Sequence, residues 1–410
     1  MEHKAVRSPL NIIVIVAALG YFVDIYDLIL FSIVRVSSLE ALGITGEMNK
    51  TIGLRLLNTQ MIGMLIGGII WGILGDKKGR LSVLFGTILL YSLANIANGM
   101  ITSLDQYYVL RFFAGVGLAG ELGVGITLVS EIMSKESRGY GTTIVSGVGI
   151  AGAVAGFFVA DLFDWRTAYY VGGGLGLVLL IMRISVYESG MFARVKHASV
   201  KKGSFISLFN DKKRFGKFIR CILIGVPVWY VIGVLVSFSD KIGSPAGLNV
   251  LGHIEVGKSV MYHYIGASIG AFATGILSQW LKSRRKALLI ALSSLVLTLT
   301  WCYLSRNISV EQYYFVLFVV GLSNGFWSVF ITIASEQFGT NLRATVTTSV
   351  PNFVRGLTVA VTTAFSYFTG SLGIIGAAAA VGVVTIGLAF FAVLTMEESF
   401  HKDLDYIEEC

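Results

Sequence analysis

The sequence predicts an all-α integral membrane protein with twelve transmembrane helices arranged as two related six-helix halves. Hydrophobic residues make up 55% of the chain and charged residues only 14%, and the mean hydropathy is +0.76. Soluble domains carry about 25% charged residues, so the composition indicates a membrane protein. Two further observations predict the architecture: twelve long apolar runs, and a segment that occurs twice about half a chain apart.

Each apolar run is long enough to cross a bilayer, which takes about 20 residues in a helix. In chain order the runs cover residues 10–34, 53–74, 81–103, 107–131, 140–162, 167–187, 217–240, 258–281, 286–305, 312–335, 345–369 and 372–396. The loops between them are short, except after the sixth run. The predicted parts are an N-terminal six-helix bundle over residues 1–187, a cytoplasmic central loop over 188–216, and a C-terminal six-helix bundle with a short tail over 217–410.

The repeated segment covers residues 106–143 and again 312–348. Both copies start with Gln-Tyr-Tyr and end with Thr-Thr, and the charged residues that they share are Glu131 and Arg138 in the first copy and Glu336 and Arg343 in the second. Two large apolar halves repeated in the same direction are typical of transporters whose halves are related by a pseudo-twofold axis along the membrane normal.

Basic residues predict the orientation. The net charge is +8, and the Lys and Arg residues concentrate in the loops on the side of the two termini, above all in the central loop. Cytoplasmic loops carry such an excess, so both termini are expected in the cytoplasm. The minimal outer loops favour a bacterial inner membrane. Because the basic residues lie in these loops, we expect no nucleic-acid partner. We also expect the protein to be a monomer in the lipid bilayer.

Charged residues inside the apolar runs are the strongest functional signals, because a charge in mid-membrane costs about 2.5–3.5 kcal/mol on insertion scales. Asp24 and Asp27 are three residues apart and share one face of the first helix. The first copy of the repeat contains Arg111 and Glu121, where the second copy has apolar residues. Asp27 and Arg111 lie at similar predicted depths, so we expect a contact between them, either proton-sensitive or a static packing bridge.

The second half contributes aromatic and polar residues to the predicted site. Arg355 lies near mid-membrane with no acidic partner in its own half, and we expect it to contact either the substrate or backbone carbonyls. His263, near the start of the eighth run, is expected to be an interfacial histidine near the outer surface. The full set of predicted substrate-binding residues is Arg111, Trp229, Tyr230, Asn324, Trp327, Asn352 and Arg355.

The second run ends in a Gly-x-x-x-Asp-x-x-Gly-Arg sequence whose acidic residue is Asp76. A degraded copy, with Gln279 in the acidic position, follows 203 residues later. This pattern resembles the signature loop of the major facilitator superfamily. The resemblance implies a latch on the cytoplasmic side, and the residues predicted to form it are Asp76, Gly79, Arg80, Glu131, Arg138, Glu336 and Arg343.

Two short stretches are similar to the metabolite:proton symporter group of that superfamily. They are Asp24 to Asp27 in the first helix, with Tyr26 before the second acid, and Gly120-Glu121 in the fourth helix. Compact intraphagosomal amino-acid transporters of bacteria are a similar kind of relative. The resemblance implies the major facilitator fold, in which helices 1, 4, 7 and 10 line a central cavity and the halves rock about it.

The sequence contains no P-loop, no nucleophile–base pair and no metal-ligand cluster, so we expect neither an enzyme nor a cofactor or metal site. We expect a proton-coupled symporter that imports a small carboxylate-bearing metabolite, such as an organic acid, amino acid or osmolyte, by alternating access. Asp27, together with Asp24, would titrate beside Arg111, and Glu121 would relay the proton. Two alternatives stay open: an exporter of a metabolite, carboxylate siderophore or drug, and a transport-inactive membrane sensor.

Overall fold

The computed structural model describes residues 10–78, 80–188, 205–403 and 406–408. Its helices are α1 (Ile12–Glu40), α2 (Gly46–Lys78), α3 (Arg80–Asn98), α4 (Leu104–Leu118), α5 (Glu121–Ile132), α6 (Arg138–Ile150), α7 (Gly152–Leu162), α8 (Trp165–Glu188), α9 (Ser207–Asn210), α10 (Lys212–Tyr230), the π-helix η2 (Val231–Val236), α11 (Ser239–Ile242), α12 (Val256–Trp280), α13 (Arg284–Leu304), α14 (Val310–Asn324), α15 (Trp327–Glu336) and α16 (Thr340–Thr395).

Within the described chain, ten helical segments are long and apolar enough to cross a membrane, and several of them, such as Leu104–Ile132, join two consecutive helices. A shorter apolar helix at Val83–Asn98 adds another crossing. The 56-residue α16 contains two crossings that meet at Gly373, whose φ of 70° is a conformation that glycine adopts readily. These segments account for the twelve predicted runs and confirm the predicted fold class.

The fourth and tenth crossings are each interrupted at the same place in the repeat. The break between α4 and α5 contains Gly120, and the break between α14 and α15 contains Gly325, which is 205 residues later. At Gly325 the backbone of Gly270 in α12 approaches so closely that a β-carbon would clash with it. The sequence therefore breaks both helices at matching positions, near the middle of the molecule.

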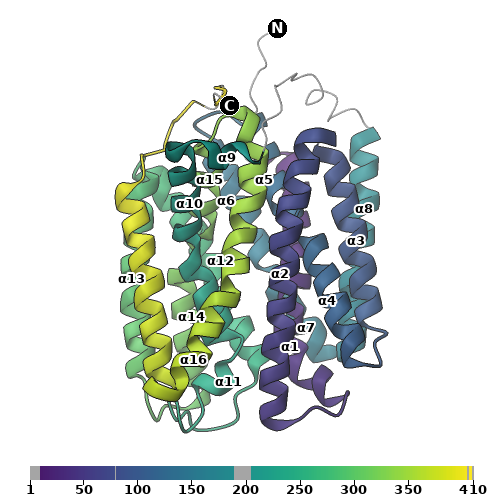
Figure 1. Cartoon of the computed structure of the whole chain (residues 1–410), viewed down its shortest axis with the longest axis vertical. Helices are drawn as coiled ribbons and strands as arrows, with labels where there is room; N and C mark the ends of the chain where they lie inside the picture. Colours follow the sequence, from purple (N-terminus) through teal and green to yellow (C-terminus); the bar gives the residue numbers. More distant parts are fainter. Residues whose placement is uncertain (1–9, 79, 189–204, 404–405, 409–410) are drawn as a thin grey trace.

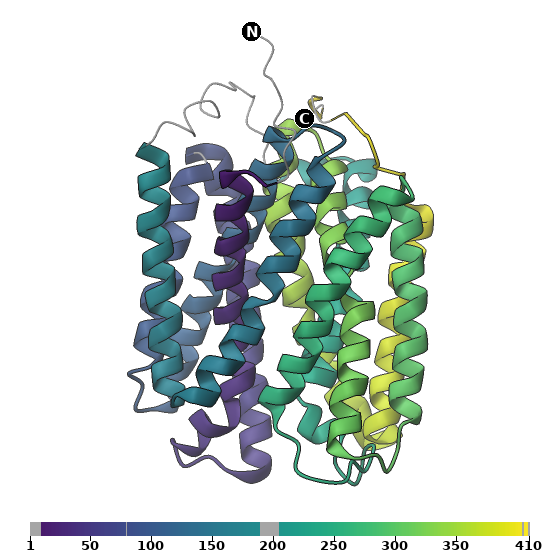
Figure 2. The same ribbon diagram turned by 180° about the vertical axis from the view of Figure 1, so that it is seen from behind.

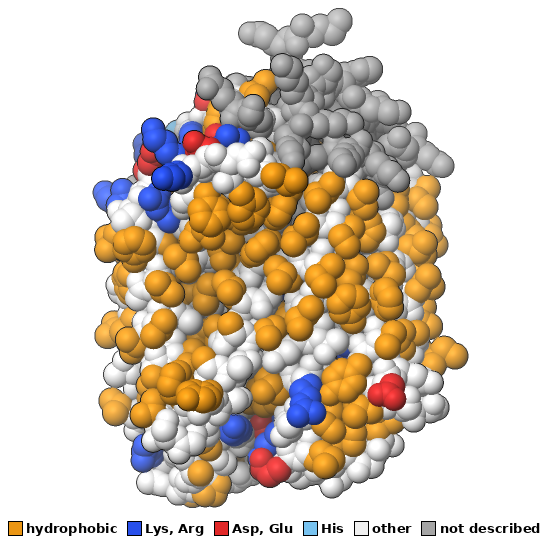
Figure 3. Space-filling view, viewed as in Figure 1, with side chains coloured by type: hydrophobic (Ala, Val, Ile, Leu, Met, Phe, Trp, Pro, Cys, Tyr) orange, Lys and Arg blue, Asp and Glu red, His pale blue; other side chains and the backbone are white. Residues whose placement is uncertain are grey.

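The helices form two groups that stand side by side, one from the first half of the sequence and one from the second (Figures 1 and 2). The start of α1 and the end of the described chain lie at the same end of the molecule, called here the terminus side (Figure 1). On the face seen in Figure 3, hydrophobic side chains cover the middle of the molecule and charged side chains gather near both ends. This distribution suits a protein whose middle faces lipid.

Contacts between equivalent residues locate the axis that relates the two halves. Ser32 in α1 hydrogen-bonds Ser237 at 3.1 Å, and Ser130 in α5 hydrogen-bonds Ser335 in α15 at 3.2 Å. Each pair is separated by 205 residues, which is also the offset of the sequence repeat. A residue meets its own repeat partner only near the symmetry axis, so the two contacts place the pseudo-twofold axis between the halves.

Candidate functional site

A small cavity of about 30 Å³ lies between the halves. Residues from both halves line it, among them Tyr21, Ile150, Trp229, His263, Asn324 and Trp327. A volume of this size has room for about one water molecule, so the halves have closed around the cavity. Three of the four predicted crossings line it: the first (α1), the seventh (α10 and η2) and the tenth (α14 and α15). Helices α6 and α12 line it as well, and the fourth crossing contributes no lining residue among those described.

An ion pair between the two halves lies beside this cavity. Asp24 of α1 and Arg355 of α16 are both fully buried, and Arg355 Nη2 lies 3.7 Å from Asp24 Oδ2. The guanidinium carbon of Arg355 is also 5.7 Å from the ring centroid of Trp229 and 5.9 Å from that of Trp327. Both distances allow a cation–π interaction. The pair therefore joins the halves next to the two cavity tryptophans.

This ion pair answers the question that the sequence left open for Arg355. Its acidic partner, Asp24, belongs to the other half of the chain and is 331 residues away. The pattern of hydrophobic residues along a helix does not show which distant helix packs against it, so this pairing could not be predicted. Asn352, which was predicted to bind substrate, instead accepts a hydrogen bond from Arg355 Nη1 at 3.4 Å. It donates to the backbone oxygens of Ala119 and Thr348. Asn352 therefore holds Arg355 in place and is absent from the cavity lining.

The expected contact between Asp27 and Arg111 is not formed. Arg111 is fully buried and donates to Gln60 of α2 and, at 3.5 Å, to Tyr169 of α8. Its guanidinium also stacks over Phe31 at 4.8 Å. These neighbours occupy both terminal nitrogens of Arg111 without Asp27, whereas its Nε has no hydrogen-bond partner among the described residues. The carboxylate of Asp27 is buried and accepts no hydrogen bond from the described residues.

Glu121 also has a partner that the sequence did not reveal. Both of its carboxylate oxygens accept from Arg183 of α8, with Nη1 at 3.0 Å from Oε2. The pair lies inside the first half, against Gly20 of α1, where a β-carbon would collide with both side chains. Arg183 was missed because an arginine four residues before the predicted end of a helix is ordinary at the cytoplasmic flank of a membrane span.

The other predicted substrate-binding residues of the second half divide into two groups. Trp229, Asn324 and Trp327 line the cavity, as expected. Tyr230 does not, because its hydroxyl packs inside the second half, where it bonds to Tyr303 and donates to the carbonyl of Ala378. His263 was expected at the outer surface but is fully buried on the cavity wall.

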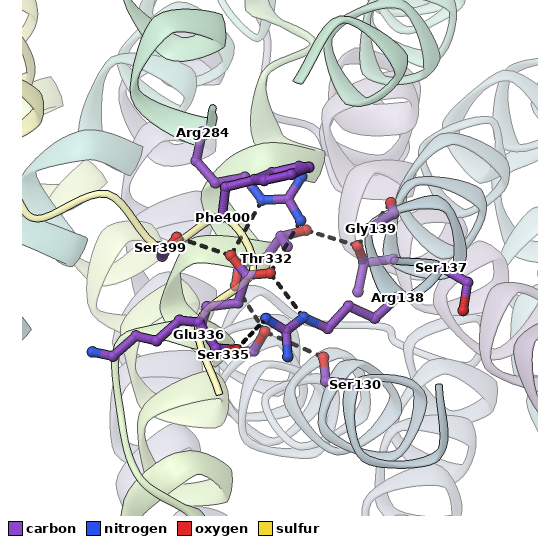
Figure 4. A network of polar contacts seen from close by, with 12 residues as sticks. Ser130, Ser137, Arg138, Gly139, Arg284, Thr332, Ser335, Glu336, Ser399 and Phe400 are labelled. Atoms are coloured by element: carbon purple, nitrogen blue, oxygen red, sulfur yellow. Dashed lines mark hydrogen bonds and ion pairs between the residues drawn. The ribbon is translucent and has the colours of Figure 1, made fainter. Parts of the chain in front are cut away.

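On the terminus side, the repeated charged residues form ion pairs across the halves, and Figure 4 shows the pair of Arg138 with Glu336. Arg138 Nε lies 3.0 Å from Glu336 Oε1, and Arg343 Nη1 lies 3.5 Å from Glu131 Oε1. The two pairs exchange places under the 205-residue repeat, so they are symmetry mates. Each arginine of one half thus meets the glutamate of the other, as expected for residues that latch the halves together.

The second copy of the signature loop takes part in the same network. Arg284 donates through Nη2 and Nε to both carboxylate oxygens of Glu336, at 3.0 and 3.2 Å (Figure 4). With its amide oxygen turned toward α6, Gln279 accepts from the backbone nitrogens of Gly139 and Tyr140 at 3.3 and 3.1 Å. The first copy of the loop cannot be compared, because Gly79 and the side chains of Asp76 and Arg80 lie outside the described part of the chain.

The halves also meet at the opposite end. Arg35 of α1 forms an ion pair of 3.0 Å with Asp240 of α11, and its guanidinium lies 4.9 Å from the ring centroid of Phe238. Arg35 and Asp240 are again 205 residues apart, next to the pair formed by Ser32 and Ser237. The central cavity is therefore closed off by cross-half contacts at both ends.

Two pseudo-symmetric helical halves that close around a buried central cavity are the architecture of a transporter that works by alternating access. The Major Facilitator Superfamily model matches residues 17–363. The chain therefore belongs to the major facilitator superfamily. Members of this family are transporters and not enzymes, in agreement with the sequence-based expectation.

Several relatives carry organic acids in their names. The chain is 25% identical to a probable 4-methylmuconolactone transporter of Cupriavidus pinatubonensis, over 93% of this chain and 89% of that protein. It is 27% identical to the cis,cis-muconate transport protein of Acinetobacter baylyi, over 95% and 94% of the two chains. Such relatives agree with the predicted metabolite:proton symporter group.

A solved structure supports the fold. The proton:xylose symporter XylE, bound to 6-bromo-6-deoxy-D-glucose, superposes with a TM-score of 0.71 at 14% identity. The alignment covers 96% of this chain and 97% of that one. At this identity the likeness establishes the shared fold and says nothing about the substrate.

Proposed function

We propose that the protein imports a small planar carboxylate together with a proton, by alternating access. The observation that carries this proposal is the buried Asp24–Arg355 ion pair, which joins the halves beside a cavity flanked by Trp229 and Trp327. An arginine remains charged in any protein environment. Its planar guanidinium matches a carboxylate in shape and charge, so Arg355 supplies the recognition of an anion.

The surroundings of Arg355 favour a flat and unsaturated substrate. Trp229 and Trp327 present large aromatic surfaces beside the cation, and such rings stack well on planar ligands. Relatives are named for 4-methylmuconolactone, cis,cis-muconate and, in Pseudomonas putida, 4-hydroxybenzoate. These compounds are small unsaturated carboxylic acids, which supports extending the same substrate class to this chain.

The ion pair also suggests how a proton is coupled to the substrate. A substrate carboxylate that binds Arg355 takes the place of Asp24, whose own carboxylate is then buried without a cation. A buried unpaired carboxylate is unstable in its ionised form, so Asp24 takes up one proton as the substrate enters. One anion and one proton then cross together without net charge, and Asp27, one helical turn away, provides a second protonation site in our proposal.

The two sets of cross-half contacts serve as the gates of this cycle in our proposal. The contacts of Glu336 and Arg138 must break for the cavity to open toward the terminus side, and the Arg35–Asp240 pair must break for it to open toward the opposite side. We place both termini in the cytoplasm of a bacterial cell and keep the six-plus-six domain boundaries, on the strength of the basic loops. Reporter fusions at each end of the chain test this orientation.

Uptake into proteoliposomes tests the proposed function. The substrate panel contains benzoate, 4-hydroxybenzoate, nicotinate and cis,cis-muconate, with an amino acid and a betaine as other metabolite classes. We expect an inward proton gradient to stimulate the uptake of a planar carboxylate. The Arg355→Gln variant should lose this uptake, whereas Arg306→Gln, a change at an exposed loop arginine, should keep it.

Two results would contradict the proposal. Equal uptake with and without the gradient would remove the proton coupling. Efflux of substrate from loaded vesicles under a gradient of the opposite direction, with no inward uptake, would instead support an exporter.

A further inference from the structure

The cavity wall contains a buried amide that is only partly satisfied. Asn324, at the end of α14, is 1% exposed and lines the cavity. Its Nδ2 donates to the carbonyl of Val228 at 3.4 Å and lies 3.4 Å from His263 Nε2. Its Oδ1 has no hydrogen-bond partner among the described residues. Buried polar atoms in native proteins nearly always have a partner, so this oxygen is a candidate ligand contact.

The neighbours of Asn324 fix which end of the amide stays open. A backbone carbonyl only accepts hydrogen bonds, so the amide nitrogen must face Val228. The same nitrogen faces His263 Nε2. The histidine is then neutral, and its unprotonated Nε2 accepts the hydrogen bond. The oxygen of Asn324 is thereby held as a hydrogen-bond acceptor, and turning the amide over would set two acceptors against each other.

This acceptor belongs to the same part of the cavity as Arg355. Val228 precedes Trp229, and Asn324 lies three residues before Trp327; these are the two tryptophans whose rings flank the arginine. A small ligand that lies between the two tryptophan rings, with its carboxylate bound to Arg355, is therefore close to Asn324. The site therefore offers the Arg355 cation to a carboxylate of the ligand, and the neutral Asn324 oxygen to a hydrogen-bond donor of the ligand.

We propose that Asn324 Oδ1 accepts a hydrogen bond from a hydroxyl or N–H group of the substrate, so that the substrate is a hydroxylated or N–H-bearing planar carboxylate. This inference rests on the proposed function and specifies its substrate class. In the closed state the cavity has room for about one water molecule, which can satisfy Asn324 until the substrate displaces it. A plain carboxylate displaces that water without replacing its hydrogen bond, and binds more weakly for that reason.

The test compares matched ligands by binding. The purified full-length protein in nanodiscs is titrated with benzoate, 3-hydroxybenzoate and 4-hydroxybenzoate, and the quenching of tryptophan fluorescence reports occupancy beside Trp229 and Trp327. The main variant is Asn324→Leu, which keeps the size of the side chain and removes its polar atoms. The control is Ser323→Ala, the adjacent buried residue, which bonds to Ser294 and is not a cavity-lining residue.

We expect the wild-type protein to bind a hydroxybenzoate at least about tenfold more tightly than benzoate, because an unpaired buried acceptor is costly. Asn324→Leu should reduce this ratio to about one, because it removes the hydrogen bond to the hydroxyl group and also the cost of leaving the Asn324 oxygen unpaired when benzoate is bound. Ser323→Ala should leave the ratio unchanged. Benzoate binding as tightly as both hydroxybenzoates, or a ratio that survives Asn324→Leu, overturns the inference and leaves the proposed function intact. Absence of binding by any carboxylate, with a folded protein, overturns both.

Discussion

At the scale of single residues, Gly20 illustrates how a small side chain permits a buried ion pair. Glu121 and Arg183 meet at the surface of α1 opposite Gly20, where any larger residue would collide with them. Both charges belong to the first half and are buried, so their contact need not change when the halves move. We therefore propose a structural role for Glu121, as an alternative to the proton relay predicted from the sequence.

The substitution Glu121→Gln tests this assignment. Removing one partner of a buried ion pair leaves the other charge uncompensated, at a cost of about 3–5 kcal/mol. We expect a clearly lower melting temperature in detergent, with the gradient stimulation of uptake retained by the protein that remains folded. The double variant Glu121→Gln, Arg183→Met should recover part of the stability, because it removes both charges. Loss of gradient stimulation at an unchanged melting temperature would return Glu121 to the proton pathway.

The charged residues also show what the sequence can and cannot predict about the site. Asp24, Asp27, Arg111, Glu121 and Arg355 stood out because charges are rare and costly inside apolar helices. Their partners did not, because helix periodicity places a residue on a face without saying which helix covers that face. The pairing of Asp24 with Arg355 follows from how the two halves dock. Arg111 instead meets Gln60 and Tyr169 through the packing of helices within the first half.

At the scale of elements, the segment after α16 forms a strap over the terminus-side contacts. Ser399 donates to Glu336 at 2.8 Å (Figure 4), and Arg138 donates to the carbonyl of Lys402 at 2.7 Å. Lys135 pairs with Asp403 at 2.5 Å. Lys135 and Arg138 belong to the first half and the strap follows the second, so the strap adds contacts that must break when this end opens.

Glu398 anchors the strap to the second half. Its carboxylate accepts from Ser283 Oγ at 2.5 Å and from the backbone nitrogen of Arg284 at 3.0 Å, at the start of α13. Partial burial opposes ionisation, but these bonds and those from the backbone of Phe400 and Arg285 together lower the pKa of Glu398 below its usual value. The carboxylate therefore stays ionised at neutral pH and holds the base of the strap.

A chain that ends at Glu398 should open more often on the terminus side. The reporter is Ser130→Cys, a buried position on the axis between the halves, in a Cys410→Ser background where Cys221 and Cys302 are buried. We expect maleimide labelling at residue 130 to become several-fold faster when the strap is removed, because the contacts from Ser399, Lys402 and Asp403 are lost. Equal labelling rates in the two chains would show that the strap does not hold this end closed.

At the scale of the whole molecule, the repeat accounts for both ends of the transport path. The pairs Ser32–Ser237 and Arg35–Asp240 at one end, and Ser130–Ser335 at the other, all join residues 205 positions apart. An axis that passes through both ends allows the halves to rock about the central cavity, so that one end opens while the other stays closed.

The Arg35–Asp240 pair, at the end opposite the termini, gives the opposite prediction to the strap. Asp240→Asn removes the ion pair with Arg35 and should favour opening at that end. We expect faster labelling of Ser32→Cys and slower labelling of Ser130→Cys, because the halves rock as rigid bodies. Glu255→Gln, at an exposed residue, serves as the control. Faster labelling at both positions would indicate a general loosening and would contradict the rocking model.

More of the architecture than of the site could be predicted from the sequence. Twelve apolar runs and one repeated segment sufficed for the fold class, because length and hydropathy are local properties of a membrane helix. The sequence did not predict that α6 and α12 line the cavity, or that His263 lies on its wall, because both depend on the crossing of whole helices. The predicted latch could be assigned only for Glu131, Arg138, Glu336 and Arg343, whose side chains are described.

The most direct test of the account is the Asp24→Asn variant in proteoliposomes, measured in two assays with the same labelled carboxylate. Asparagine keeps the size of the side chain but cannot carry the proton. We predict that exchange of internal for external substrate, which needs no net proton movement, persists, while accumulation driven by an inward proton gradient is lost; Asp161→Asn, an exposed control, should retain both. Accumulation by Asp24→Asn equal to that of the wild-type protein would contradict the central claim, which is that Asp24 takes up a proton when the substrate carboxylate replaces it on Arg355.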